Sequence, residues 1–189
     1  MMRRKPNSAY RTREHLTEVE VAALIEAARS NRDGRRDAAM ILTAYRHGLR
    51  PSELVDLRWS QVDLDAATIH VNRLKNRKPS THPIRDDELL ALRRLPHVSP
   101  FVFMSERGGP FTAAGFGWMV KRAGRKAGLP FQVHPHMLRH SAGYKLATDG
   151  HDTRRIQLYL GHRNIQHTTR YLELAPNRFA NFWRDAEAA

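Results

Sequence analysis

The stretch HPHMLRHSAGYKLATDG at residues 134–150 decides the fold of this chain. Its apolar residues Leu138, Ala142 and Leu146 recur at steps of four, which is the spacing of one face of an α-helix. Pro135 suits the first turn of that helix, because an N–H group there would have no partner within the helix. We therefore predict an amphipathic helix that lays its apolar face on the protein core.

Another face of the same helix carries groups that could bind an anion. His136 and Arg139 are three residues apart, so an imidazole and a guanidinium can converge on one anion. A solvated face without a ligand is the alternative that this segment leaves open. His136 and His140 have a helical spacing too, but Met137 replaces the glutamate of an HExxH zinc motif. We expect no metal site, and a core or surface role for His140.

Downstream, the segment DTRRIQLYLGHRN at residues 152–164 predicts a short helix. Asp152 is a candidate N-cap, and Gly161 lies where a helix commonly ends in the left-handed conformation. His162 then falls in a turn, and Tyr171 follows on a further short helix. One more turn of chain would bring both residues to the same cleft, although a histidine just past a helix end is often only a surface residue.

Upstream, two helices are predicted over residues 18–30, with Thr17 as N-cap, and over residues 36–47, ending at Gly48. A third begins at Pro51. Arg50 directly precedes it, where backbone N–H groups also favour an anion. The alternative is an ordinary cap in which Arg50 pairs with Glu53 or another acid.

Residues 60–84 change to a strand pattern. Asp63 and Asp65 indicate a turn, and Ile69 and Val71 alternate with polar residues. A basic connection follows, and its cations are Lys75, Arg77 and Lys78. Lys75 ends the strand, so its ammonium could reach across a groove to DNA, although hairpin lysines are usually just solvated. Because this is the only clear sheet signal, the fold class is mainly α with one small antiparallel β-sheet.

Composition bounds the function. The 189 residues carry 32 Lys and Arg against 19 Asp and Glu, a net charge of +13 that attracts polyanions such as nucleic acid or an anionic membrane surface. Cysteine is absent, which excludes disulfides, thiolate catalysis and cysteine zinc sites. No run of about 18 apolar residues occurs, so we expect a cytoplasmic protein without a membrane partner. The length favours one domain over residues 14–189, preceded by a basic arm at residues 1–13.

A further basic cluster falls on one side of a helix predicted near residues 112–128. It is a candidate for tracking DNA phosphates, and a solvated face is an equal alternative. Its members are Lys121, Arg122, Arg125 and Lys126.

Four ordered motifs between residues 16 and 183 resemble the catalytic domain of the tyrosine recombinase (phage integrase) family. GLRPSEL (48–54) looks like its first arginine box and HPHMLRHS (134–141) its His-x-x-Arg box. LGHRN (160–164) looks like its Leu-Gly-His element, and HTTRYL (167–172) its nucleophile segment. RLKNRKPSTHP (73–83) also looks like the lysine hairpin of the small recombinases that invert promoter segments in fimbrial phase variation.

The resemblance implies a role for each matching residue. Arg50, Arg139 and His162 would bind the scissile phosphate, Lys75 and His136 would be acid-base groups, and Tyr171 would be the nucleophile. The reaction would cut and rejoin DNA through a 3′-phosphotyrosyl link and need no metal, nucleotide or other cofactor. His136 would act as base or orienting group for the tyrosine, and Lys75 would protonate the departing 5′ oxygen.

The implied partners are double-stranded DNA with inverted-repeat sites, further copies of the chain in a homotetramer, and accessory DNA-bending proteins. The wider family has an N-terminal core-binding domain for which this chain has no room, so the basic arm and partner subunits would compensate. The alternative is that the coding sequence has been truncated. Two other functions stay open: relaxation of DNA in the manner of a type IB topoisomerase, and a catalytically idle DNA-binding regulator of the same fold.

Overall fold

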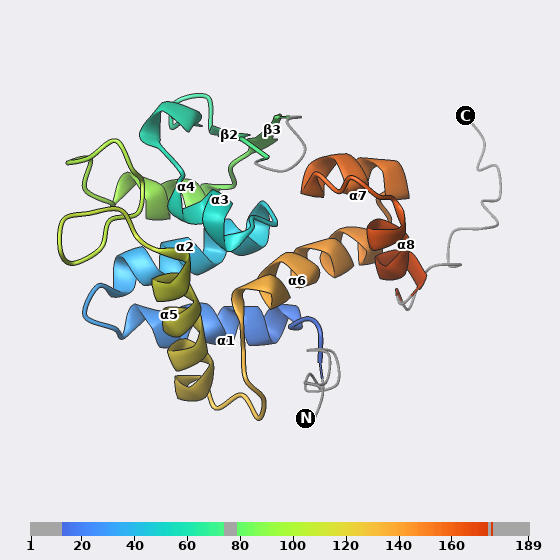
Figure 1. Ribbon diagram of the computed structural model, residues 1–189, viewed down its shortest axis with the longest axis horizontal. Coiled ribbons are helices and arrows are strands. Elements are labelled where there is room, and N and C mark those ends of the chain that lie inside the picture. The colour runs from blue at the N-terminus through green and yellow to red at the C-terminus, as the bar shows by residue number, and fades with distance from the viewer. Residues whose placement is uncertain (1–12, 74–78, 174, 176–189) are drawn as a thin grey trace, which may run out of the picture.

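The computed structural model describes residues 13–73, 79–173 and 175, and within them the fold is mainly helical with one small antiparallel sheet, as predicted (Figure 1). In chain order the elements are α1 Glu18–Arg29, α2 Gly34–Arg46, α3 Pro51–Val55, the 3-10 turn η2 Trp59–Gln61, β1 Val62–Asp63, β2 Thr68–Val71, β3 Ser80–Pro83, α4 Asp86–Arg93, α5 Ala113–Lys126, α6 Pro135–Thr148, α7 Thr153–Leu160 and α8 Gln166–Glu173.

Local signals in the sequence fix several helix ends. Thr17 caps α1 in a capping box with Glu20, and Asp152 caps α7 by accepting from two backbone N–H groups. The predicted glycine stops are confirmed, since Gly48 and Gly161 have φ of 55° and 64°. Helix α2 begins two residues before the predicted start, at Gly34.

The sheet has the order β1-β2-β3 with both pairs antiparallel. The predicted turn is confirmed: Asp63 accepts from the backbone N–H groups of Asp65 and Ala66 and turns the chain from β1 into β2. In β2, Ile69 and Val71 face the core while the alternate residues face outward. Arg73, two residues after Val71, is also buried, so the alternation of buried side chains continues past the end of β2.

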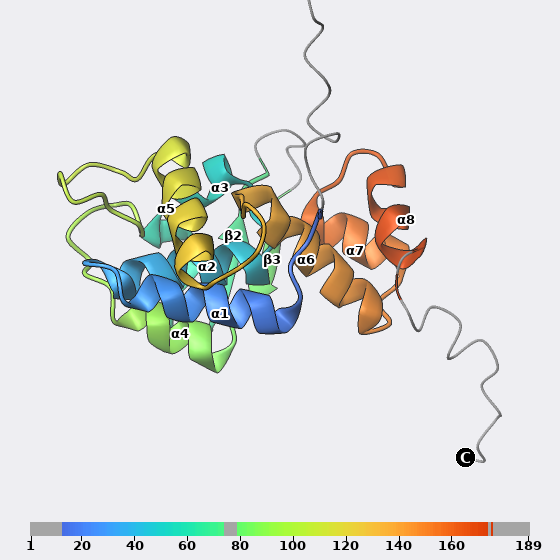
Figure 2. The ribbon, with the colours of Figure 1, turned by 90° about the horizontal axis from the view of Figure 1, so that it is seen from below.

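Two hydrophobic cores share helix α6. Its first half packs Met137 and Leu138 into the large core formed with α1, α2, α3, α5 and the sheet. Its second half forms a small core with α7 and α8, which includes Ala142, Leu160 and Tyr171. Figures 1 and 2 show α7 and α8 gathered at the far end of α6. The site described below lies where these two cores meet.

Of the helices in the described ranges, none combines the length and the apolar character needed to span a bilayer.

Candidate active site

Two glycine turns bring the end of α2 against the end of α7. A Cβ atom added at Gly48 would lie 2.4 Å from Cδ2 of Leu160, and one added at Gly161 would lie 2.8 Å from Cγ of Arg73. Each glycine is therefore required both for its positive φ and for a close approach. Because Arg50 follows the first turn and His162 follows the second, the packing of these turns brings the two predicted phosphate binders to one place.

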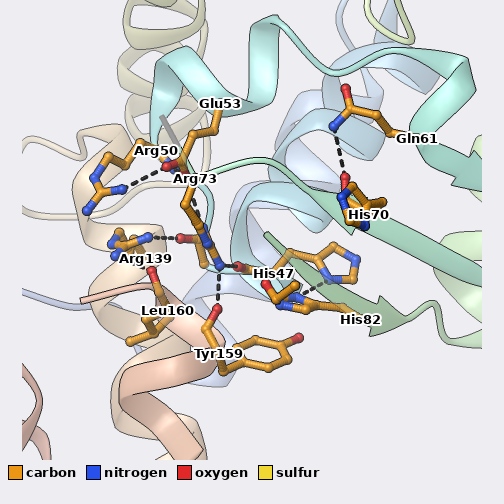
Figure 3. Close-up of polar contacts among 12 residues, drawn as sticks. His47, Arg50, Glu53, Gln61, His70, Arg73, His82, Arg139, Tyr159 and Leu160 are labelled. Atoms are coloured by element: carbon orange, nitrogen blue, oxygen red, sulfur yellow. Dashed lines mark hydrogen bonds and ion pairs between the residues drawn. The ribbon is translucent and has the colours of Figure 1, made fainter. Parts of the chain in front are cut away.

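Arg139 joins the two turns. Its guanidinium is buried and donates to the carbonyl oxygens of Gly48 and Leu160, from the ends of α2 and α7 (Figure 3). Burial, together with repulsion from Arg50 and Arg73, lowers the pKa of Arg139 to about 9, so the group stays charged at neutral pH. His136, three residues earlier on α6, is exposed.

Arg73 is a third arginine of this site, and the sequence analysis missed it. It donates to Oε2 of Glu53 at 2.9 Å, to the carbonyl oxygen of His47 at 3.1 Å and to the carbonyl oxygen of Tyr159. The exposed fraction of its side chain is 0%. One signal could have revealed it: Arg73 continues the inward alternation of Ile69 and Val71, and a charge at an inward position of a strand needs a buried partner.

Glu53 is that partner, and it also holds Arg50. The Arg50 guanidinium donates to Oε1 at 2.7 Å and the Arg50 backbone N–H to Oε2 at 2.9 Å. Although burial opposes ionisation, these donors and the Arg73 guanidinium keep the pKa of Glu53 below its usual value. The alternative of an Arg50–Glu53 pair is therefore what the structure contains. One carboxylate serves two guanidiniums, and the site keeps an excess of positive charge.

An open cleft of about 770 Å³ lies over this cluster. Three arginines and two histidines contribute to its lining, which consists of Arg50, Arg154, Gln157, His162, Arg163, Asn164, Ile165 and His167. A cleft with this charge and size can hold a phosphodiester group.

His162 lies at the edge of the cleft with a fixed ring. Its Nδ1 is 2.9 Å from Oγ1 of Thr168, a buried residue of α8. Burial lowers the pKa of His162 to about 3, and the charge of Arg139 adds to this, so the imidazole is neutral at pH 7. The ring centroid lies 6.1 Å from that of Tyr171. The two rings therefore lie near each other, but the lining of the cleft includes His162 and not the buried Tyr171.

Tyr171 is buried, with an exposed fraction of 3%. Its ring packs on Gly143, where a Cβ atom would lie 2.4 Å from Cε2, and meets Tyr144 edge-on at 5.1 Å between centroids. Its hydroxyl is 3.0 Å from Nδ1 of His140. Burial raises the pKa of Tyr171 to about 12. His140, to which the sequence analysis gave only a core or surface role, thus contacts the predicted nucleophile.

A buried polar chain ties β3 to the end of α2. Nδ1 of His47 is 3.2 Å from Nδ1 of His82, Nε2 of His47 is 3.1 Å from Glu88, and Ser80 is 2.8 Å from Nε2 of His82. Burial lowers the pKa of His82 to about 3. Arg73, which follows β2, is also bonded to the end of α2, because it donates to the carbonyl oxygen of His47. Both strands that flank residues 74–78 are therefore bonded to the α2 end, which precedes Arg50.

The remaining predicted residues lie apart from this cluster or outside the described ranges. Lys75, Arg77 and Lys78 belong to residues 74–78, and most of the basic arm is residues 1–12; neither range is described. On α5, Lys121 lies over the Trp118 ring and Lys126 donates to the carbonyl oxygen of Ser30, while Arg122 and Arg125 are exposed. In the described part of the chain no three His, Asp or Glu side chains are grouped to hold a metal ion.

Comparison with known proteins gives consistent matches. Residues 14–178 match the model of the phage integrase family. The chain is 43% identical over 180 residues to the type 1 fimbriae regulatory protein FimE of Escherichia coli K12, covering 90% of this chain and 91% of FimE. Identity to the type 1 fimbriae regulatory protein FimB of the same strain is 41% over 179 residues, covering 90% of each. The crystal structure of XerA recombinase superposes with a TM-score of 0.77 at 28% identity, covering 98% of this chain and 70% of XerA.

Proposed function

This chain belongs to the phage integrase family, and we propose that it inverts a promoter segment in fimbrial phase variation by cutting and rejoining DNA at inverted-repeat sites. The observation that carries this proposal is the match to FimE, a fimbriae regulatory protein of which the chain spans 91%. The enzyme class is tyrosine site-specific recombinase. Relaxation of DNA without strand exchange is not favoured, because the relatives are recombinases and fimbrial regulators.

The cleft supports a role for Arg50, Arg139 and His162 in binding the scissile phosphate. Attack on a phosphodiester gathers negative charge on the non-bridging oxygens, and fixed cations and an imidazole N–H stabilise that charge. Nδ1 of His162 faces Thr168, so Nε2 is the nitrogen available to the phosphate. Arg139 has five N–H donors and uses two groups on backbone carbonyls, which leaves others for a phosphate oxygen.

Tyr171 is the proposed nucleophile. Its oxygen bonds to phosphorus while the bond from phosphorus to the 5′ oxygen breaks, which leaves a 3′-phosphotyrosyl link that retains the energy for rejoining. Lys75 is the proposed acid that gives its proton to the 5′ oxygen. His136, exposed in the first turn of α6 three residues before Arg139, is proposed as an acid-base or orienting group for the attack of Tyr171.

Sequence-independent contacts and assembly complete the proposal. We propose that Arg77, Lys78 and the exposed cations of α5 hold the DNA backbone, together with the arm at residues 1–13, while residues 14–189 form the catalytic domain. Double-stranded DNA would be bound by a homotetramer, assisted by DNA-bending proteins, in the bacterial cytoplasm at the nucleoid. The net charge of +13 supports binding to DNA.

The test uses a plasmid in which DNA from the region of the chain's own gene carries the candidate inverted repeats around a marker. Purified protein should invert the marker, which a change in restriction pattern reports, and Tyr171→Phe should abolish inversion while DNA binding persists. Relaxed plasmid without inversion would favour the topoisomerase alternative. Binding without inversion or a covalent adduct would favour the idle regulator.

A further inference from the structure

The hydroxyl of Tyr171 is held in one direction. Its ring is fixed between the Cβ-free surface of Gly143 and the edge of Tyr144, and the hydroxyl oxygen then lies 3.0 Å from Nδ1 of His140. The ring planes meet at 63°, with centroids 6.0 Å apart. In the tautomer that carries its proton on Nε2, Nδ1 of His140 accepts the hydrogen bond of the hydroxyl, and it can also take the proton.

Few other groups are placed to accept the proton of this hydroxyl. Tyr171 is 3% exposed, so bulk water has little access to it. Nδ1 of the neighbouring His162 faces Thr168. Among the described residues, the hydroxyl forms its hydrogen bond with His140.

The protonation states suit a transfer from Tyr171 to His140. Burial lowers the pKa of His140 to about 4; Glu14 opposes this shift, while His136, Arg139 and Arg170 add to it. The imidazole is therefore neutral at pH 7 and can accept. Burial raises the pKa of Tyr171 to about 12, so the phenolate does not form in advance and the proton must leave as the attack proceeds.

We propose that His140 is a catalytic residue that accepts the Tyr171 proton when the tyrosine attacks phosphorus, an inference that rests on the proposed recombinase function. The O–H bond breaks and an N–H bond forms at Nδ1, so the imidazole becomes an imidazolium. The phosphorus–tyrosine bond forms as the 5′ oxygen leaves and takes a proton from the acid. On rejoining, the imidazolium returns its proton to the phenolic oxygen.

The surroundings of His140 allow this cycle. The scissile phosphate brings a negative charge into the adjacent cleft, which favours the imidazolium that the free protein disfavours. Glu14 acts in the same direction and is itself held by Arg170, with an N–O distance of 2.9 Å. Arg139, Arg170 and His136 act in the opposite direction. Binding of DNA therefore shifts His140 toward accepting a proton.

The closing experiment measures single-turnover formation of the covalent adduct on a nicked duplex carrying the inverted-repeat site. His140→Asn places an amide at the position of Nδ1, so it can hold the hydroxyl but cannot take its proton. We expect adduct formation to slow by about 10²-fold or more. Its rate should rise steadily with pH, because hydroxide must now remove the proton. His151→Asn, which replaces an exposed histidine after α6, should keep the wild-type rate and profile.

A second substrate distinguishes proton donation to the leaving 5′ oxygen from proton removal at Tyr171. A 5′-bridging sulfur in place of oxygen gives a leaving group that needs no proton, so it should restore Lys75→Ala but not His140→Asn. Wild-type rates in His140→Asn, or an equal loss at every pH, would overturn the proton-transfer role. Faster cleavage would mean that the contact restrains the resting tyrosine, and would overturn it too. An inactive wild type on every site would instead contradict the proposed function itself.

Discussion

Arg73 and Arg139 both bridge the C-terminal end of α2 and the C-terminal end of α7, each by hydrogen bonds to one carbonyl group at either end. Arg73 donates to the carbonyl oxygens of His47 and Tyr159, and Arg139 donates to those of the next residues, Gly48 and Leu160. Helix C-termini leave carbonyl groups without partners and carry partial negative charge, so a guanidinium is well suited to join two of them. The distance between Arg50 and His162 therefore depends on both arginines.

Replacing Arg73 should destabilise the protein strongly. Arg73→Met removes the bonds to both helix ends and takes one of two cationic partners from the buried Glu53. Breaking a buried pair by removing one partner typically costs about 3 kcal/mol or more. Urea unfolding followed by circular dichroism should show this loss, and the double variant Arg73→Met with Glu53→Gln should recover part of it. A loss below about 0.5 kcal/mol, the usual size for a surface change, would contradict the bridging role.

Gly143→Ala tests whether the Tyr171 ring must lie where it does. Alanine in the middle of a helix is normally favoured over glycine by about 1 kcal/mol. Here the new Cβ would lie 2.4 Å from the tyrosine ring, so the ring must move and the hydroxyl must leave His140. We expect at least a tenfold slower covalent adduct in a protein that still folds. Gly117→Ala in α5 is the matched control, because its Cβ would meet nothing within 4 Å and should leave the rate unchanged.

Stability should fall as the pH is lowered from about 6.5 toward 3. His82, His140 and His162 have folded-state pKa values of about 3, 4 and 3, so the unfolded chain binds their protons at a higher pH than the native protein does. Their contribution is fully present above pH 6.5 and is lost below it, with a slope of at most about 4 kcal/mol per pH unit. Urea unfolding at pH 7 and pH 5.5 measures the slope. An unfolding free energy that is equal at both values would contradict the neutral, buried state of these rings.

The exposed cations of α5 should contribute to DNA affinity without sequence preference. Arg122→Gln and Arg125→Gln should each reduce the slope of log affinity against log salt by about 1, and weaken binding to unrelated duplexes equally. Arg35→Gln, at an exposed arginine in the first turn of α2, is the control and should leave the slope unchanged. Fluorescence anisotropy across a salt series gives these slopes. Unchanged slopes in the α5 variants would mean that this face is only solvated.

The sequence by itself determined the elements of this protein and the residues to examine. Thr17, Gly48, Asp152 and Gly161 act on backbone groups within one helical turn, so their caps follow from local sequence. The order of four motifs was also readable, because it resembles that of the phage integrase family. That resemblance made Arg50, Arg139, His162 and Tyr171 candidate site residues.

Only the tertiary structure decided which of these groups touch. Arg73 binds a carboxylate 20 residues away, and His140 meets a hydroxyl 31 residues away, and neither separation follows a helical or strand period. Tyr171 is buried because α8 folds back onto α6, although its own segment is short and polar. Such contacts arise from the packing of two cores around one helix. Because packing depends on the whole set of side chains at once, no local pattern in the chain specifies it.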